Sequence, residues 1–204
     1  MEWATLALLV LIGYLIGSIP FSYLVARTQG VDLRVVGSGN TGASNVWRSC
    51  GFGYFLVALV LDIVKGFVPT ALAYRVFHTT PTATIAVGLA AMAGHVFPIF
   101  MGFRGGKAVA TSGGVILAFQ PVLLIVSALI WTAIYRISGY PSVASLLGMV
   151  ILALAATGLT LLDRLDPVFT GFIWVSGVIF FYLHRGNIVR LMRGTENRIR
   201  QKTK

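Results

Sequence analysis

The chain has 204 residues, of which 57% are hydrophobic and only 11% are charged, and its mean hydropathy is +0.87. Soluble domains are about half apolar and about a quarter charged, so this composition excludes an ordinary soluble domain and predicts an integral membrane protein. The net charge of +10 does not indicate nucleic-acid binding, because the cations lie between hydrophobic segments and in the C-terminal tail, where anionic lipid head groups are the natural partners.

Seven apolar segments follow one another along the chain. The first has no charged residue and is longer than a signal-peptide core, so we expect it to be a retained span. The fourth has about 14 residues and crosses a hydrocarbon core of roughly 30 Å only if the bilayer thins or the helix tilts little. Segments four and five therefore form either a shallow hairpin of two spans or one long kinked span. The segments run approximately over residues 3–25, 53–74, 82–101, 107–120, 121–137, 141–162 and 167–184.

The distribution of Lys and Arg favours seven spans. With seven, the connections at 27–48, 104–107 and 136 and the tail after residue 184 share one side, and they carry three, two, one and seven cations, which is 13 of the 16. Cytoplasmic loops are rich in Lys and Arg, so this side is cytoplasmic, the N-terminus is outside and the C-terminus is inside. A six-span arrangement would send a basic segment outward. The sequence thus predicts a single all-α domain over residues 1–204 with seven transmembrane helices in the cell membrane.

Two opposite charges lie inside the second segment. Asp62 and Lys65 are three residues apart, on one face of a helix, and can therefore form an ion pair. Charges within a membrane are functional candidates. A structural ion pair that holds helices together is nevertheless the favoured interpretation, and the sequence leaves the alternative open.

The first basic connection contains a long polar run with three glycines. Glycines expose backbone donors, Ser and Asn add side-chain donors, and Arg provides a bidentate fork for phosphate. A polar turn with helix caps is the alternative, since Asn and Ser are good caps. The length of the run favours a ligand-binding loop with Ser38, Gly39, Asn40, Asn45 and Arg48 as candidates. The run reads Gly37-Ser38-Gly39-Asn40-Thr41-Gly42-Ala43-Ser44-Asn45-Val46-Trp47-Arg48.

A second polar stretch follows the third segment and includes Arg104-Gly105-Gly106-Lys107. Glycines let backbone N–H groups converge on an anion, and we expect Lys107 to open a helix whose N-terminus points at a phosphate. Pro98 interrupts the preceding segment, so His95 lies about one helical turn from this site. The alternatives are a glycine turn with snorkelling cations and a histidine that is merely packed.

The third stretch begins at the membrane boundary with His184 and continues through Asn187 to Glu196. An amphipathic basic tail on anionic lipid explains cations such as Arg190, but it requires neither a His-Arg-Gly-Asn group nor a lone acid among bases. Ser142 and Ser145, at the start of the sixth segment, are interpreted as helix-packing residues unless they border the same cavity.

Donors and cations thus gather on the cytoplasmic side, where carboxylates are scarce. There is no Cys/His cluster, and Asp32 and Glu196 are the only acids nearby, so we expect no metal site. A Gly-x-Ser-x-Gly elbow for a covalent serine mechanism is also missing. The residues alone predict a membrane enzyme or carrier for a phosphorylated, lipid-like substrate.

Together the three stretches resemble the motifs of the bacterial acyl-phosphate:glycerol-3-phosphate acyltransferase family, the PlsY family. The first resembles its Gly-Ser-Gly-Asn…Gly-Ala…Asn…Arg motif and the second its Gly-His-x-Phe-Pro…Phe-Lys-Gly-Gly-Lys…Val-Ala-Thr motif. The third resembles its His-Arg-x-Asn-Ile…Arg-Leu…Gly-Thr-Glu motif. The resemblance covers residues 37 to 197 in the family's order, with Arg104 where Lys is common and Gly186 where Glu is common.

The resemblance implies the family's seven-span fold and its reaction. A fatty acyl group would pass from acyl phosphate to the 1-hydroxyl of glycerol 3-phosphate, giving lysophosphatidic acid and inorganic phosphate in the first acylation of phospholipid synthesis. It implies no cofactor and neither acyl-CoA nor acyl carrier protein as donor. The expected partners are acyl phosphate, glycerol 3-phosphate and the lipid bilayer, with the active site facing the cytoplasm. Chain-length preference and oligomeric state stay open, a monomer included.

The resemblance also implies roles for individual residues. Lys107 would neutralise charge on the departing phosphate, while His184 and Asn187 would orient glycerol 3-phosphate or its hydroxyl. The proton acceptor stays open between His95, His184 and the substrate's own phosphate. An organophosphate transporter and an acyltransferase with a thioester donor are the competing classes. The substrate-binding set comprises Ser38, Gly39, Asn40, Asn45, Arg48, Arg104, Gly105, Gly106, Ser142, Ser145 and Glu196.

Overall fold

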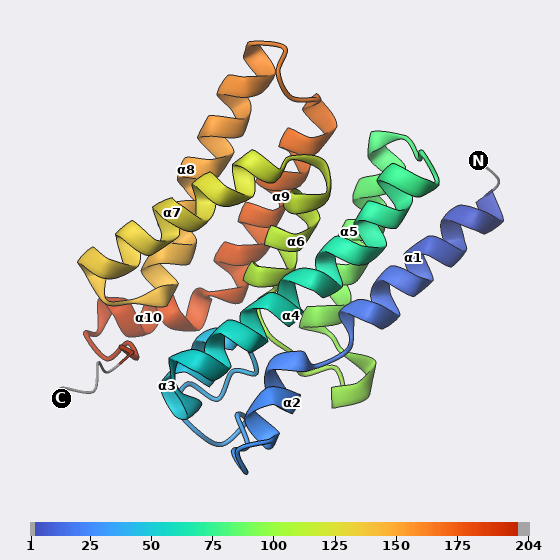
Figure 1. Ribbon diagram of the computed structural model, residues 1–204. Helices are drawn as coiled ribbons and strands as arrows, with labels where there is room; N and C mark the ends of the chain where they lie inside the picture. Colours follow the sequence, from blue (N-terminus) through green and yellow to red (C-terminus); the bar gives the residue numbers. More distant parts are fainter. Residues whose placement is uncertain (1–2, 200–204) are drawn as a thin grey trace.

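The computed structural model describes residues 3–199, and all regular structure within that range is helical (Figure 1). The all-α prediction is therefore confirmed for this part of the chain. A π-helical turn, Leu72–Val76, continues α4, and a 3-10 turn, Ile99–Met101, follows α5. The α-helices are α1 (Trp3–Gly17), α2 (Phe21–Arg27), α3 (Ala43–Cys50), α4 (Phe52–Ala71), α5 (Pro81–Val96), α6 (Val109–Phe119), α7 (Pro121–Ser138), α8 (Pro141–Leu161), α9 (Pro167–Leu183) and α10 (Arg185–Met192).

Prolines begin four of the helices, at Pro81, Pro121, Pro141 and Pro167. The first turn of a helix tolerates proline because an N–H at that position has no intrahelical acceptor. The start of α9 is also capped, since a side-chain oxygen of Asp166 accepts a hydrogen bond at 2.8 Å from the backbone N–H of Val168, the second residue of the helix. The sequence thus marks these helix starts locally.

Within residues 3–199, five stretches are long and apolar enough to cross a membrane. Helices α9 and α10 add a sixth if they count as one span bent by 57°. Helix α6 has 11 residues and measures roughly 16 Å, which is shorter than a hydrocarbon core. Such a set of apolar helices is typical of an integral membrane protein. The five stretches are Trp3–Arg27, Phe52–Val76, Pro81–Met101, Pro121–Ser138 and Pro141–Leu161.

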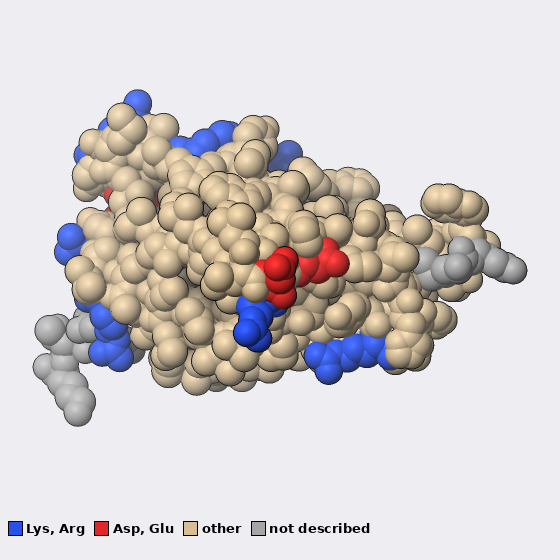
Figure 2. Space-filling view, turned by 90° about the horizontal axis from the view of Figure 1, so that it is seen from above, with Lys and Arg blue, Asp and Glu red and all other residues tan. Residues whose placement is uncertain are grey.

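The helices form a bundle with α4 in the middle, where it contacts α1, α2, α3, α5 and α6 (Figure 1). Helix α1 pairs with α5, and α7 pairs with α8, which in turn contacts α9. Seen from above, this face is mostly uncharged, with a small acidic group directly beside a basic one near its centre and other basic side chains toward its edges (Figure 2). The largest buried hydrophobic cluster joins α5, α6, α8 and α9.

Glycines permit the extensive contact between α4 and α6. Gly66 on α4 faces the carbonyl oxygen of Thr111, and Gly114 on α6 faces the carbonyl oxygen of Ile63. A Cβ atom at either glycine would overlap the facing oxygen. The two backbones therefore approach each other as closely as small-residue packing between membrane helices allows.

A buried ion pair joins α4 to the end of α1 and the start of α2. Lys65 Nζ lies 2.9 Å from Asp62 Oδ1, as the spacing of the two residues predicted, and both side chains are almost fully buried. Ser22 donates a hydrogen bond to the other carboxylate oxygen at 2.6 Å. Lys65 Nζ also donates to the carbonyl oxygen of Ile19 at 3.0 Å. The pair therefore holds the break between α1 and α2 against α4.

We expect Asp62→Asn to reduce the free energy of unfolding by about 3–5 kcal/mol, because the Lys65 ammonium would stay buried without its counter-charge. The unfolding temperature in detergent measures this loss. Replacing both partners, with Asp62→Leu and Lys65→Met, removes both charges and should recover most of the stability. An Asp62→Asn protein that is as stable as the parent but inactive would contradict a structural role.

Candidate active site

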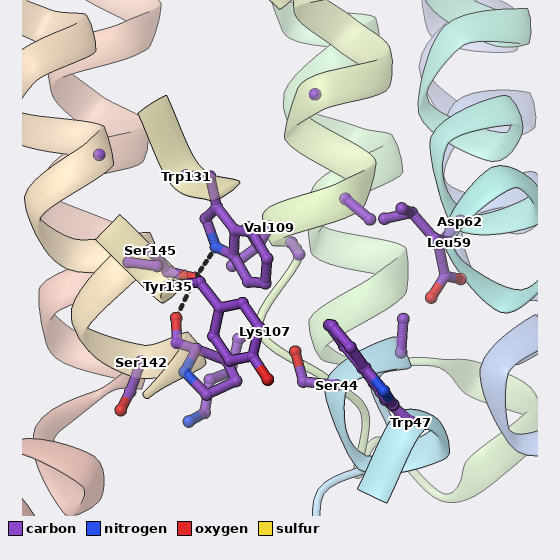
Figure 3. Close-up of a pocket in the computed structure, with 18 of the residues that line it drawn as sticks. Ser44, Trp47, Leu59, Asp62, Lys107, Val109, Trp131, Tyr135, Ser142 and Ser145 are labelled. Atoms are coloured by element: carbon purple, nitrogen blue, oxygen red, sulfur yellow. Dashed lines mark hydrogen bonds between the residues drawn. The ribbon is translucent and has the colours of Figure 1, made fainter. Parts of the chain in front are cut away.

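A cavity of about 460 Å³ lies between the α3–α4 side of the bundle and helices α6 to α10. Figure 3 shows Lys107, Ser142 and Ser44 toward one end, with Trp131, Val109 and Leu59 farther along. One end is polar, and the remaining wall is mostly apolar. The residues of the polar end are Ser38, Asn40, Arg48, Lys107, Ser142, His184, Asn187 and Glu196.

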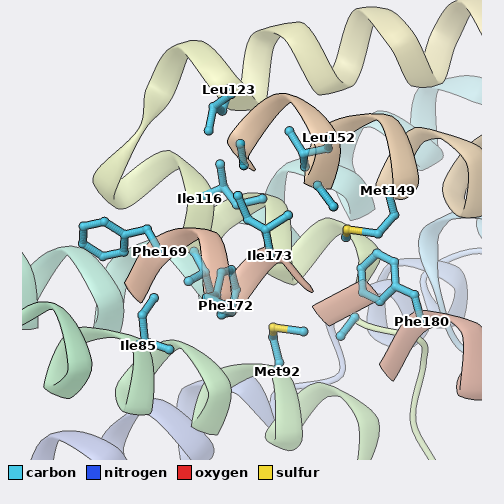
Figure 4. Close-up of a cluster of buried hydrophobic side chains, with 14 of the residues drawn as sticks. Ile85, Met92, Ile116, Leu123, Met149, Leu152, Phe169, Phe172, Ile173 and Phe180 are labelled. Atoms are coloured by element: carbon cyan, nitrogen blue, oxygen red, sulfur yellow. The ribbon is translucent and has the colours of Figure 1, made fainter. Parts of the chain in front are cut away.

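The apolar wall of the cavity is continuous with the hydrophobic core. Ile116, Met149, Leu152 and Phe180 line the cavity and also belong to the largest buried cluster (Figure 4). Because these side chains are packed within a cluster that joins α5, α6, α8 and α9, they form a firm apolar surface. The space can therefore take an apolar chain while the polar end takes a charged group.

Asn45 organises the first polar loop. Its Oδ1 accepts a hydrogen bond from the backbone N–H of Ser38 at 3.0 Å, and its Nδ2 donates to the carbonyl oxygens of Leu33 and Val36. The Asn45 side chain is only 1% exposed. The polar atoms of the Asn45 side chain thus form hydrogen bonds with the backbone of the same loop. These bonds place Ser38 beside Arg48, whose Nη1 lies 3.5 Å from Ser38 Oγ.

Of the two other predicted residues of this loop, Asn40 lines the cavity and Gly39 does not. Asn40 lines the cavity, and its Oδ1 accepts a hydrogen bond from the N–H of Gly42 at 3.0 Å, which shapes the turn before α3. Gly39 has a positive φ of 69° and is not among the residues that line the cavity. Gly39 therefore contributes to the path of the loop.

The second polar stretch is fastened to the end of α5. The N–H of Gly105 donates to the carbonyl oxygen of Val96 at 3.0 Å, and the N–H of Gly106 donates to that of His95 at 3.1 Å. These amides are therefore occupied within the chain, although the sequence suggested that they were free to bind phosphate. The chain continues through Ala108, at φ 57°, into α6, which begins at Val109.

Lys107 consequently lies in a loop ahead of α6, and the expectation that it opens the helix is wrong. The hydrogen bonds between Gly105–Gly106 and α5 hold this loop in a non-helical path, and they join parts of the chain that sequence periodicity does not connect. The loop directs Lys107 into the cavity, whereas Arg104 is exposed and does not line it.

His95 fills the space between α5, this loop and α6. Its Nδ1 shares a hydrogen bond of 3.0 Å with the hydroxyl of Thr111, and it lies 3.8 Å from an Asp62 carboxylate oxygen. A Cβ atom on Gly106 would overlap the His95 ring. The ring and the glycine thus fit against each other directly behind Lys107.

A chain of hydrogen bonds joins the second and third polar stretches. Lys107 Nζ donates to Asn187 Oδ1, and Asn187 Nδ2 donates to Glu196 at 2.5 Å. Glu196 also accepts from the hydroxyl of Ser142 at 2.8 Å and from Arg190 Nε at 2.8 Å. Arg190, which a lipid-facing tail would place outward, is instead a partner of the only carboxylate among the residues of the polar end.

The charges at the polar end alter the acidities of its residues. Burial lowers the pKa of Lys107 to about 8, with Glu196 opposing the change and Arg190 and Arg48 adding to it. Burial likewise lowers the pKa of Arg48 from its ordinary value. Burial acts to raise the pKa of Glu196, but hydrogen bonds from Asn187, Ser142 and Arg190 outweigh it and lower that pKa. The polar end is therefore cationic, with one ionised acid within it.

His184 stands at the bend between α9 and α10. Its Nδ1 lies 2.8 Å from the carbonyl oxygen of Phe180, and since a carbonyl only accepts, Nδ1 carries the proton. In the neutral ring Nε2 is then an acceptor. Because His184 lines the cavity, this nitrogen can accept a proton or hydrogen bond from a substrate hydroxyl.

Three aromatic residues that the sequence did not single out line the cavity between α3 and α7 (Figure 3). Trp47 and Tyr135 face each other at 5.1 Å between ring centroids, and Trp131 stacks on Tyr135 at 5.4 Å. Trp131 Nε1 donates to Ser145 Oγ at 3.0 Å, so Ser145 borders the cavity as a support for Trp131. Aromatic side chains near the ends of apolar segments were the available signal.

The family model described as glycerol-3-phosphate acyltransferase matches residues 7–194 of this chain. The chain belongs to that family. It is 50% identical over 190 residues to the glycerol-3-phosphate acyltransferase of Roseiflexus sp. (strain RS-1), covering 93% of each chain. It is 42% identical to that of Aquifex aeolicus (strain VF5), covering 93% of this chain and 97% of the relative.

Two crystal structures of PlsY, an integral membrane glycerol 3-phosphate acyltransferase, are similar to this fold over 95% of both chains. The glycerol 3-phosphate form superposes with a TM-score of 0.87 at 39% identity. The lysophosphatidic acid form superposes with a TM-score of 0.85 at 36% identity. The resemblance to the PlsY family is confirmed, and the chain is an integral membrane acyltransferase of phospholipid synthesis. Within residues 3–199, no group of three or more His, Cys, Asp and Glu side chains comes together as a metal site would require.

The fit between Gly106 and His95 predicts that Gly106→Ala reduces acyltransferase activity by about 100-fold, because an added Cβ displaces the loop that carries Lys107. Turnover with glycerol 3-phosphate measures the effect, and the unfolding temperature checks that the protein is folded. Gly171→Ala is the matched control, since a Cβ there meets no atom within 4 Å. Parental activity in Gly106→Ala would show that the position of the loop does not matter.

Proposed function

We propose that this chain transfers a fatty acyl group from acyl phosphate to the 1-hydroxyl of glycerol 3-phosphate, giving lysophosphatidic acid and inorganic phosphate. The divided cavity carries this proposal, because Arg48 and Lys107 stand at the polar end of a space whose remaining wall is mostly apolar. An acyl phosphate has the same division into a charged group and an apolar chain. The solved relatives, one in a glycerol 3-phosphate form and one in a lysophosphatidic acid form, support the acceptor and the product.

Arg48, with Ser38 and Asn40, holds the phosphate of glycerol 3-phosphate, and Lys107 lies beside the phosphate of the acyl donor. Arg48 supplies planar, directed donors and Lys107 a compact charge, while the Ser38 hydroxyl and the Asn40 amide supply neutral donors. A low-dielectric cavity strengthens each of these interactions. Other residues of the predicted set support these four from outside. In the loops they are Gly39, Asn45, Gly105 and Gly106, with Arg104 beside them at the surface. Ser142 and Glu196 lie around Asn187, and Ser145 accepts a hydrogen bond from Trp131.

The reaction needs positioning and charge stabilisation more than covalent chemistry, because an acyl phosphate is already activated. The 1-hydroxyl oxygen attacks the acyl carbonyl carbon, the bond between that carbon and the phosphate oxygen breaks, and Lys107 neutralises the charge that develops on the departing phosphate. His184 Nε2 and Asn187 orient the hydroxyl. His184 accepts the hydroxyl proton and the departing phosphate is its final acceptor, while His95 acts through the loop that carries Lys107.

We also propose a single domain over residues 1–204 with seven spans, the N-terminus outside and the C-terminus in the cytoplasm of a bacterial cell. The start of α1 and helix α10 lie at opposite ends of the bundle, which supports an odd number of crossings (Figure 1). The charge distribution along the sequence supports the direction, since 13 of the 16 Lys and Arg belong to the connections at 27–48, 104–107 and 136 and to the segment after residue 184. Glycerol 3-phosphate then reaches Arg48 from the cytoplasm, and the acyl chain enters from the bilayer.

Release of inorganic phosphate by the purified protein tests the reaction. With palmitoyl phosphate we expect release only when glycerol 3-phosphate is present, together with formation of lysophosphatidic acid. Release without the acceptor would indicate a hydrolase. Transfer from acyl-CoA but not from palmitoyl phosphate would support an acyltransferase activity but reject acyl phosphate as its donor. If neither donor reacts, a transporter would be favoured.

The low pKa of Lys107 predicts a pH dependence. Its protonated form is the active one, so kcat/KM should be high below pH 8 and fall as the pH rises through about 8, where the free enzyme loses this proton. In Lys107→Arg the side chain stays charged at high pH, so kcat/KM should no longer fall above pH 8. The overall rate should be lower, because a planar guanidinium does not replace the compact charge of an ammonium group. Lys107→Ala should lose at least about 100-fold. A parental kcat/KM that stays constant above pH 9 would contradict this role.

A further inference from the structure

The segment that follows α10 borders the polar end of the cavity at Glu196 and reaches Arg48. We call residues 193–199 the C-terminal strap. The carbonyl oxygen of Asn197 accepts a hydrogen bond from Arg48 Nη2 at 3.1 Å, and the carbonyl oxygen of Arg198 accepts one from Arg48 Nε at 3.3 Å. Two consecutive carbonyls therefore hold the Nε–Nη2 edge of the guanidinium.

The remaining donors of Arg48 face the cavity. Nη1 lies 3.3 Å from Asn45 Oδ1 and 3.5 Å from Ser38 Oγ, both of which line the cavity. A guanidinium is planar, so fixing the Nε–Nη2 edge also fixes the direction of the two terminal nitrogens. The strap thereby decides which way the positive group points.

The strap is fastened on both sides of the two carbonyls. Before them, Glu196 accepts hydrogen bonds from Ser142, Asn187 and Arg190. After them, Ile199 is 8% exposed and packs in a buried cluster. The residues of that cluster around Ile199 are Tyr135 and Ala144, with Trp47, Trp131 and Ile134 packed against it.

The buried contacts of Ile199 link the strap to the aromatic residues of the cavity. Trp47 and Tyr135 come from α3 and α7, on the two sides of the pocket, and their rings are 5.1 Å apart (Figure 3). The Arg198 guanidinium adds a further contact, 4.7 Å above the Tyr140 ring. Burial of an isoleucine side chain is worth about 1.5–3 kcal/mol, so this seat is a substantial anchor for a segment without regular structure.

We propose that Ile199 is a positioning residue for the acceptor substrate, an inference that rests on the proposed role of Arg48 in binding the phosphate of glycerol 3-phosphate. Ile199 holds the carbonyls of Asn197 and Arg198 on the Nε–Nη2 edge of Arg48, and the guanidinium is thereby aimed at the substrate phosphate. The strap is part of the acceptor site although its side chain at 199 touches no reacting atom.

Steady-state kinetics of Ile199→Ala test the inference. We expect KM for glycerol 3-phosphate to rise about tenfold, with kcat and the KM for acyl phosphate within about twofold of the parent, since an interaction made equally in the ground and transition states affects KM alone. Ile199→Val keeps most of the buried surface and should restore the parental KM. Ile137→Ala is the matched control, because Ile137 at the end of α7 is 88% exposed and should have no effect.

A double-mutant cycle with Arg48→Lys tests whether Ile199 acts through Arg48. In the Arg48→Lys protein there is no guanidinium to aim, so adding Ile199→Ala should change KM for glycerol 3-phosphate by less than about twofold. A tenfold effect that persists in this background would overturn the inference. A parental KM in Ile199→Ala, or an equal fall in all parameters with a lower unfolding temperature, would also overturn it.

The measurement separates this inference from the proposed reaction. The KM for glycerol 3-phosphate can be measured with whichever acyl donor the parent protein uses, acyl phosphate or acyl-CoA. Failure of acyl phosphate as donor therefore rejects the proposed donor and leaves the positioning role testable. If the parent is active and its Ile199 variants have the parental KM for glycerol 3-phosphate, the positioning role is rejected and the proposed reaction is not.

Discussion

One carboxylate offsets the mutual repulsion of the cations at the end of the cavity. Besides burial, Arg190 lowers the pKa of Arg48 and of Lys107, Arg48 also lowers that of Lys107, and Glu196 opposes both changes. Three hydrogen bonds keep Glu196 ionised in spite of its burial, because they favour the charged form of the acid. The same bonds attach the C-terminal strap to α8 and α10. Glu196 thus offsets the charge of these three cations only in part, and the polar end keeps a net positive charge.

Local signals predicted most of the helical architecture. Apolar length and the prolines at 81, 121, 141 and 167 mark helices, because both act within a few residues. The start of α6 was missed for the opposite reason. Gly105 and Gly106 are held by carbonyl oxygens of α5, and no periodicity in the sequence reports those bonds. Helix α3 was likewise hidden in a polar run whose glycines resemble an irregular loop.

The candidate site was predictable in its membership more than in its contacts. Ser38, Arg48, Lys107, His184 and Asn187 were indicated by residue type and family motif, and all line one cavity. Residue type does not distinguish the two asparagines of the set. The side chain of Asn45 forms its hydrogen bonds within its own loop, whereas that of Asn187 accepts one from Lys107, which is distant in the sequence. The aromatic wall was missed because Trp and Tyr at the ends of apolar segments equally suit a lipid interface.

The glycine contacts between α4 and α6 determine how deep the chemistry sits. Helix α6 is too short for its hydrophobic length to set its position in a bilayer. Sliding α6 along α4 would move the backbone oxygens of Thr111 and Ile63 away from gaps that only glycine leaves, at Gly66 and Gly114. Bilayers of different thickness change the tilt of long helices first. The position of Lys107 along the bundle is therefore set by contact between two backbones and not by the hydrophobic length of α6.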